Sequence, residues 1–273
     1  MIKRNSIKLD NCEISYIQSR EDGIPVLLLH ELSLGAITFQ DIIKSKLGDK
    51  YRLIAFDLPG HGESAYSDNP IEDYSLPGLA GTLGKVARHL HAENAILIGN
   101  GLGGNIIIEA LNDLPWVRGI CFFGTPIISN KNDVKKIFYK HPIYDKFFNG
   151  QLNEDSLDEV VKTYSKNSFH TELKELIKKS DYRFRKYFGN WIKAGEFINY
   201  KEYLRYNEIP LAVFHGTDDE LIDYAVISKI KIQNLWKNKI QLIDYASHLP
   251  QIENPKKLNR LIEEFINIIT GIL

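Results

Sequence analysis

Residues suited to hydrolytic catalysis follow strand-like runs at three separate points of the chain. A glycine-rich turn at 99–104 joins a short apolar run to a second apolar run with helical spacing. This pattern predicts a buried strand that turns sharply into a helix. Asp219 and His248 follow two later strand-like runs. The order of turn, acid and histidine along the chain matches one known order of a nucleophile–acid–histidine catalytic triad. In such a triad the histidine acts as general base and then as general acid.

The turn at 99–104 admits two interpretations. Three of its glycines satisfy the phosphate-binding pattern Gly-x-Gly-x-x-Gly, which also requires an acidic residue at the end of the next strand. That strand, at about 119–123, is followed by Gly-Thr-Pro and by no acid. The other interpretation is a nucleophile elbow, Gly-x-Ser-x-Gly. The turn matches the elbow at every position except one, because Gly101 stands where the serine belongs.

Composition excludes several classes of protein. The 273 residues, 44% of them hydrophobic, suffice for one large α/β domain with an insertion. A net charge of −1 argues against nucleic acid or an anionic membrane as a partner. Cys12 and Cys121 lie in apolar runs, as small buried hydrophobes do, and this fits a reducing cytosol. No apolar run reaches the roughly eighteen residues of a membrane span. We therefore expect a cytoplasmic protein.

Strand-like and helical patterns alternate along most of the chain. Right-handed crossovers between them predict a mostly parallel sheet with helices on both faces, preceded by a hairpin at 6–18. The expected strands are at 25–29, 52–56, 94–98, 119–123, 211–214 and 239–244, and the expected helices include 38–47, 76–91 and 255–269.

The pattern changes between 127 and 206. This stretch has no buried strand and is rich in lysine, aspartate and aromatic residues. It predicts a helical cap, or lid, inserted into a core domain formed by 1–126 and 207–273. The aromatic residues of the cap either form its own small core or line an apolar pocket over the active site.

Polar residues collect after the predicted strands. Since catalytic groups in such sheets gather at the carboxyl ends of the strands, Asp219 is expected to orient the imidazole of His248. Its neighbours are also acids, and its three-residue spacing from Gly216 selects Asp219. Asp57 precedes the elbow, and we expect it to fix its own loop through bonds to backbone N–H groups.

Four motifs together resemble the α/β-hydrolase superfamily over essentially the whole chain. They are His30 after its strand, the Asp-Leu-Pro-Gly-His-Gly-Glu-Ser run at 57–64, the elbow at 99–104, and Gly-Thr-Asp-Asp at 216–219 with Ser-His at 247–248. Within that superfamily the chain is similar to the metal-independent N-acyl homoserine lactone lactonases. The narrower similarity rests on Gly-Thr-Pro at 124–126, Tyr164, Asp-Tyr-Arg-Phe-Arg at 181–185 and Asn-Leu-Trp at 234–236.

The resemblance implies a function and further site residues. The reaction is ring opening of an N-acyl homoserine lactone, hence quorum quenching, with no cofactor and no metal. The expected ligand is a small-molecule acyl lactone or ester. Backbone N–H groups of Leu32 and Leu102 form the oxyanion hole. The expected substrate-binding residues are His30, Ser33, Tyr164 and Trp191.

Two departures from the family pattern bear on activity. Gly101 has no nucleophile, and loss of the serine costs a serine hydrolase on the order of a million-fold in turnover, so we expect an inactive or nearly inactive chain. Either the serine was replaced to trap a ligand, or the chain naturally lacks it and His248 activates a water in the vacated space. Glu31 stands where the family usually has glycine, and its side chain is expected to shift the loop that carries Leu32.

Other functions stay open. One is a ligand-binding protein on a hydrolase scaffold. Others are hydrolysis of other esters, cyanohydrin cleavage and dehalogenation. Dehalogenation fits worst, because it requires a carboxylate at the elbow and Gly101 supplies none. Retention of both Asp219 and His248 favours an enzyme.

Overall fold

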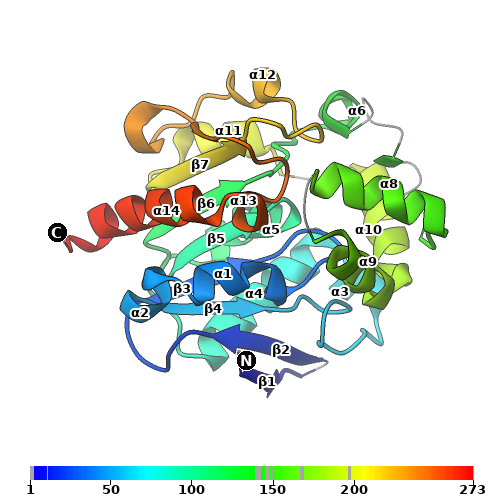
Figure 1. Ribbon diagram of the computed structural model, residues 1–273, viewed down its shortest axis with the longest axis horizontal. Helices are drawn as coiled ribbons and strands as arrows, with labels where there is room; N and C mark the ends of the chain where they lie inside the picture. Colours follow the sequence, from blue (N-terminus) through cyan, green and yellow to red (C-terminus); the bar gives the residue numbers. More distant parts are fainter. Residues whose placement is uncertain are drawn as a thin grey trace.

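Figure 1 shows a computed structural model in which helices flank a twisted sheet. The structure describes residues 3–10, 12–138, 143–144, 148, 150–166, 169–195 and 198–272. No helix within these ranges is both long and apolar enough to cross a bilayer.

Eight strands of the described chain form one sheet in the order β1-β2-β4-β3-β5-β6-β7-β8. The first two strands form an antiparallel hairpin, and β2 also runs antiparallel to β4; the other neighbours are parallel. The mostly parallel sheet and the opening hairpin confirm the prediction. The strands are β1 (Arg4–Lys8), β2 (Glu13–Gln18), β3 (Pro25–Leu29), β4 (Arg52–Phe56), β5 (Ile96–Asn100), β6 (Gly119–Phe123), β7 (Leu211–Gly216) and β8 (Gln241–Ile243).

Alternate residues of the central strands enter two separate apolar cores. Leu27 and Leu29 of β3 belong to the core that includes α4 (Leu76–His89) and α5 (Leu102–Ala110). Val26 and Leu28 belong to the core beneath α14 (Pro255–Thr270). Because successive side chains of a strand point to opposite faces, a continuous apolar run must be covered on both sides.

The remaining helices on the sheet are short. The predicted helix at 38–47 is divided into a 3₁₀ helix and two short α-helices. The second α-helix starts anew because Ser45 adopts an extended conformation and its hydroxyl caps the N–H of Leu47. The short helices, with 3₁₀ helices marked η, are η1 (Ala36–Phe39), α1 (Gln40–Ile43), α2 (Lys46–Lys50), α3 (Pro70–Asp73), η2 (Leu111–Asp113), α12 (Tyr224–Ile227), η3 (Trp236–Asn238) and α13 (Pro250–Glu253).

Five described helices lie between β6 and β7, and we refer to them as the insertion helices. Figure 1 shows α8, α9 and α10 gathered beyond one end of the strands. They are α6 (Lys131–Phe138), α8 (Glu154–Tyr164), α9 (His170–Lys179), α10 (Tyr182–Ala194) and α11 (Tyr200–Tyr206). The expected boundaries of core (1–126 and 207–273) and cap (127–206) stay a prediction.

Two hydrogen bonds at Asp181 attach α10 to the loop that follows β4. The N–H of Asp181 donates to the carbonyl of Gly60 at 2.7 Å, and the hydroxyl of Tyr74 donates to its carboxylate at 2.8 Å. Asp181 also caps α10 at the N–H of Arg183. The insertion helices are therefore fixed to the sheet at this point.

Asp57 ties together the loops that surround the carboxyl end of β4. Its carboxylate accepts from the N–H groups of Ala36 at 2.7 Å and Glu63 at 3.1 Å and pairs with Arg4 at 2.7 Å. The side chain is fully buried. The expected structural use of Asp57 is confirmed, because its oxygens are occupied by the backbone.

We predict that Asp57→Ala lowers the free energy of unfolding by about 3 to 5 kcal/mol, since two buried backbone donors lose a charged acceptor. Urea denaturation measures the change. The matched control is Arg4→Ala, which removes the partly exposed charged partner, leaves both backbone contacts in place and should cost less than Asp57→Ala. Equal losses in the two variants would contradict the role given to the backbone contacts.

Candidate active site

The turn between β5 and α5 has the geometry of a nucleophile elbow. Gly101 lies at φ 50° and ψ −111°, outside the usual regions for residues with a side chain, and its N–H donates to the carbonyl of Phe123 at 2.9 Å. A Cβ on Gly103 would lie 2.2 Å from the carbonyl oxygen of Leu29, so α5 starts in close contact with β3. The sharp strand-to-helix turn expected from the sequence is present.

Asp219 and His248 come together at the carboxyl ends of β7 and β8. The imidazole Nδ1 lies 3.0 Å from Oδ2 of Asp219, and both side chains are almost fully buried. The other oxygen of Asp219 accepts from the N–H groups of Leu221 at 2.9 Å and Ile222 at 3.1 Å. These bonds fix the carboxylate, and the carboxylate in turn fixes which imidazole nitrogen faces the cavity.

The carboxylate of Glu31 occupies the space of the absent serine side chain. An ideal Cβ on Gly101 would lie 1.2 Å from Oε2 of Glu31. That oxygen is 2.9 Å from Nε2 of His248. The expectation of a vacated space for water at residue 101 is therefore wrong, because a side chain from the loop after β3 fills it.

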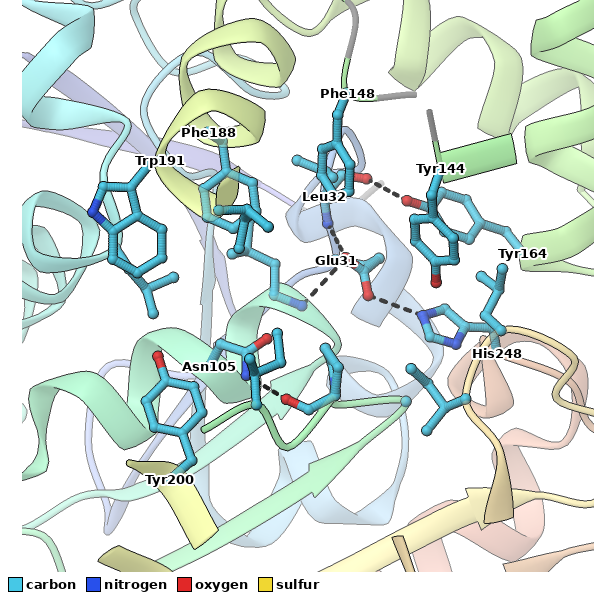
Figure 2. A pocket seen from close by; sticks show the side chains of 18 residues that line it. Glu31, Leu32, Asn105, Tyr144, Phe148, Tyr164, Phe188, Trp191, Tyr200 and His248 are labelled. Atoms are coloured by element: carbon cyan, nitrogen blue, oxygen red, sulfur yellow. Dashed lines mark hydrogen bonds and ion pairs between the residues drawn. The ribbon is translucent and has the colours of Figure 1, made fainter. Parts of the chain in front are cut away.

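The second oxygen of Glu31 lies in the expected oxyanion hole. Oε1 accepts from the N–H of Leu32 at 2.5 Å and from the N–H of Leu102 at 3.2 Å. The two predicted donors thus converge on one point, and that point is occupied by a carboxylate oxygen. Figure 2 shows Glu31 between Leu32 and the imidazole of His248.

Two carboxylates hold His248 in its protonated form. Burial lowers the pKa of His248, but the charge and hydrogen bond of Asp219, followed by those of Glu31, raise this pKa to about 10. Burial raises the pKa of Asp219, and the opposing effect of His248 leaves it below its usual value. At neutral pH the site therefore contains an imidazolium between two acids.

An apolar cavity opens in front of Glu31 and His248. The space accessible to water within it has a volume of about 40 Å³. Tyr164 lies against the site, with its ring stacked on the imidazole at 5.6 Å between centroids and its hydroxyl donating to the carbonyl of Leu32 at 3.0 Å. The lining residues are Glu31, Leu32, Leu76, Leu102, Asn105, Gly124, Pro126, Ile128, Tyr144, Phe148, Tyr164, Phe188, Trp191, Ile192, Tyr200, Leu221, Ile222 and His248.

The structure brings most of the predicted site residues together, with two exceptions. Tyr164 and Trp191 line the cavity, whereas His30 and Ser33 do not. The fully buried His30 uses one ring nitrogen to accept from the N–H of Leu58 at 2.9 Å, and the other lies 2.8 Å from the carbonyl of Glu31. Ser33 accepts from Arg185 at 3.1 Å. Both side chains hold loops in place, so we withdraw them as substrate contacts.

Sequence reasoning missed the position of Glu31 and several lining residues. Asn105, Tyr200 and Leu76 had no pattern that marked them as facing the cavity. Glu31 had one usable signal. Glu31 directly follows His30 at the end of a strand, and the same chain has glycine at the nucleophile position, residue 101. Together these two features indicate that the glutamate side chain fills the space of the missing serine.

The profile described as the alpha/beta hydrolase family matches residues 26–261, which is most of the chain. The chain belongs to the α/β-hydrolase family.

Curated relatives of this α/β-hydrolase have different activities. A non-heme chloroperoxidase, CPO-A1, of Kitasatospora aureofaciens is 24% identical over 94% of this chain and 97% of its own length. A pimeloyl-[acyl-carrier protein] methyl ester esterase of Wigglesworthia glossinidia brevipalpis is 26% identical over 89% of this chain and 94% of its own length.

Solved structures include several of the N-acyl homoserine lactonase AidH. A serine-to-glycine mutant of AidH complexed with N-hexanoyl homoserine lactone superposes with a TM-score of 0.93 at 28% identity, over 100% of both chains. AidH complexed with N-butanoyl homoserine superposes with a TM-score of 0.93 at 27% identity, over 100% of this chain and 99% of the other. The expected similarity to this group of lactonases is confirmed.

The charge state of His248 gives a direct test of the site geometry. We predict that the imidazole of this α/β-hydrolase stays protonated from pH 6.5 to 9. In Glu31→Gln its pKa falls below 10, because one of the two raising charges is removed. NMR of ¹³C-labelled histidine side chains measures the titration, and His248→Gln identifies the signal. Unchanged titration in Glu31→Gln would contradict the contact between Glu31 and His248.

The same pKa shift predicts a pH dependence of stability. A histidine whose pKa is higher in the folded state adds stability that is fully present below its unfolded pKa of about 6.5 and is lost as pH rises toward 10. Urea denaturation at pH 7, 8 and 9 should therefore give a falling free energy of unfolding, by at most about 1.4 kcal/mol per pH unit for this one group. In Glu31→Gln the fall should level off at a lower pH, because the folded-state pKa of His248 is lower, and a fall that ends at the same pH as in the unchanged protein would contradict the assignment.

Proposed function

We propose that this protein opens the ring of N-acyl homoserine lactones, and so inactivates quorum-sensing signals, without a serine at its elbow. The observation that carries the proposal is the meeting of four groups at one wall of an apolar cavity. These are the carboxylate of Glu31, the imidazole of His248 and the N–H groups of Leu32 and Leu102. The lactonase similarity over the whole chain supports the same substrate class.

The proposed roles follow from the contacts. Asp219 orients His248 through the 3.0 Å bond to Nδ1, and His248 exchanges protons with water and the reacting group through Nε2. The N–H groups of Leu32 and Leu102 stabilise negative charge on oxygen. We assign no metal or cofactor to these steps.

The cavity walls suit an acylated lactone. Phe188 and Trp191 stack at 6.1 Å between ring centroids and give an apolar surface for an acyl chain. Tyr164 stands next to the imidazole, where the lactone ring would lie. Asn105 is polar, but its side-chain N–H donates to the carbonyl of Pro126 at 2.7 Å, which fixes its orientation. The acyl amide would meet few polar partners, so affinity comes mainly from apolar contact.

One observation favours a second candidate, a ligand-binding protein without catalysis. The Glu31 carboxylate fills both the nucleophile position and the oxyanion hole. A site closed in this way could bind a lactone and never cleave it. Other carboxylic esters are the alternative substrate class for an enzyme.

Turnover of N-hexanoyl homoserine lactone by the unchanged chain separates these candidates. The missing serine alone predicts a nearly inactive chain, but Glu31 and His248 meet at the elbow, and we therefore predict hydrolysis above the buffer rate in a chelating buffer. In His248→Gln kcat should fall by about a hundredfold or more, because proton transfer is removed. A p-nitrophenyl ester reports general esterase activity. Micromolar binding by calorimetry with no turnover of either compound would replace the enzyme by the ligand-binding protein.

A second experiment tests the relation between residues 31 and 101. Gly101→Ser alone should stay without serine-type esterase activity, because its Cβ would lie 1.2 Å from Oε2 of Glu31. Gly101→Ser combined with Glu31→Gly frees both the serine and the oxyanion hole, so we predict a gain of several orders of magnitude on p-nitrophenyl esters. Thermal unfolding checks that both variants fold. Full serine-type activity in the single variant would show that Glu31 moves aside freely.

A further inference from the structure

The two oxygens of Glu31 have different surroundings. Oε1 accepts two backbone N–H bonds, from Leu32 and Leu102. Among the described residues, Oε2 has a single hydrogen-bond partner, the imidazole of His248 at 2.9 Å. The side chain is 9% exposed and belongs to the cavity wall, whereas Gly101 lies behind it and does not line the cavity. One oxygen is thus held by two backbone N–H groups, whereas the described residues hold the other through the imidazole of His248 alone.

This arrangement prevents the usual attack on a carbonyl. A serine hydrolase places the substrate's carbonyl oxygen between the two N–H donors, so that the developing oxyanion is stabilised. In this protein both donors already bind Oε1. A lactone carbonyl cannot occupy the same point while the Glu31 carboxylate remains there.

Attack on a saturated carbon does not have this requirement. Displacement at an sp³ carbon develops charge on the leaving group and not on a carbonyl oxygen bound in the hole. The carbon of the lactone ring that carries the ring oxygen is such a centre. Its leaving group is a carboxylate, which departs without a proton because its conjugate acid has a pKa of about 3.5.

We propose that Glu31 is the nucleophile of this site and opens the lactone at its alkyl–oxygen bond through a covalent glutamyl ester. The inference rests on the proposed function and specifies its mechanism. Oε2 attacks the saturated ring carbon, a carbon–oxygen bond to Glu31 forms, and the bond between that carbon and the ring oxygen breaks. The electron pair leaves with the ring oxygen as the carboxylate of the ring-opened product.

The second step uses the groups that the structure places around the ester. Water attacks Cδ of Glu31, and the negative charge that develops on Oε1 is held by the N–H groups of Leu32 and Leu102. His248 takes the proton of that water and gives a proton to the departing alkoxide. The products are the hydroxy acid and free Glu31, which now contains one oxygen from water.

The charge on His248 is consistent with this sequence. Glu31 is one of the two acids that keep the imidazole protonated. Esterification removes the charge of Glu31, and the pKa of His248 then falls, since Asp219 alone raises it. The imidazolium can release its proton to solvent at this stage and act as a base toward water.

Dehalogenation was the worst fit to the sequence because the elbow supplies no carboxylate. The structure removes that objection, since a carboxylate reaches the elbow from residue 31. Displacement of a halide at a saturated carbon by Glu31 would also give a glutamyl ester, the same kind of intermediate as the one proposed for the lactone. The lactone remains the proposed substrate because of the whole-chain similarity to AidH.

Oxygen-18 water locates the bond that breaks. In a single turnover with enzyme in excess over N-hexanoyl homoserine lactone, we expect no label in the product and a 2 Da gain in the tryptic peptide that contains Glu31. Over many turnovers the label should enter the hydroxyl group of the product. Tandem mass spectrometry assigns the label to the hydroxyl or the carboxylate fragment, and a buffer blank corrects for spontaneous hydrolysis.

The outcomes separate this inference from the proposed function. Label in the carboxylate would show acyl–oxygen cleavage and overturn the nucleophile while leaving the lactonase intact. Absence of enzymatic turnover, with no labelled peptide, would overturn both.

Two variants test Glu31 independently of the label. Glu31→Gln keeps the shape and an acceptor for Leu32 and Leu102 but removes the nucleophile, and kcat should fall by about a thousandfold or more. The matched control Glu63→Gln changes an exposed acid that pairs with Lys179 and should leave kcat within about twofold. In His248→Gln the second step is blocked, and the protein mass should rise by one whole lactone, localised to Glu31. An adduct at another residue would contradict the proposal.

Discussion

The carboxylate of Glu31 joins three parts of the chain that are distant in sequence. Its contacts reach the loop after β3, the first residue of α5 and the histidine that follows β8. These segments meet because the carboxyl ends of parallel strands share one edge of the sheet. Each contact is short and buried, so the carboxylate is well fixed. The shape of the cavity wall and the charge of His248 both depend on it.

The electrostatic balance of the site differs from that of a serine triad. A serine is neutral, whereas Glu31 adds a second acid beside the imidazole, so two carboxylates share one imidazolium in largely apolar surroundings. The burial of such groups is costly unless each charge has partners. Asp219 has two backbone N–H groups in addition to the imidazole, and Glu31 has the two N–H groups of the oxyanion hole. The backbone donors predicted to form the oxyanion hole therefore bind a carboxylate of the protein itself.

Much of the fold could be predicted because its signals are local. Apolar runs such as 25–29 and 52–56 indicate buried strands, and the glycine turn indicates the elbow. The order of turn, acid and histidine brought Gly101, Asp219 and His248 to one edge. The break in the helix at 38–47 was missed, since helical periodicity continues through Ser45 and only its capping geometry ends the helix.

Side-chain directions could not be predicted in the same way. A strand-end position places a residue near the site but does not decide whether its side chain turns into the cavity or into the loops. His30 and Ser33 turn into the loops, whereas Glu31 between them turns into the site. The meeting of Glu31 with residue 101 joins positions 70 residues apart. No sequence period records such a contact, because it depends on the path of two loops at once.

The short distance between residue 101 and Glu31 also constrains the history of the site. In any ancestor with serine at the elbow, a glutamate at position 31 could not have taken its present place. If the glycine of this chain is the natural residue, a lineage that gained the glutamate before the glycine had to hold that side chain elsewhere. Comparison of sequences on either side of this change should then reveal chains with two glycines and few with serine and glutamate together. Reversal of one change alone would leave neither arrangement complete.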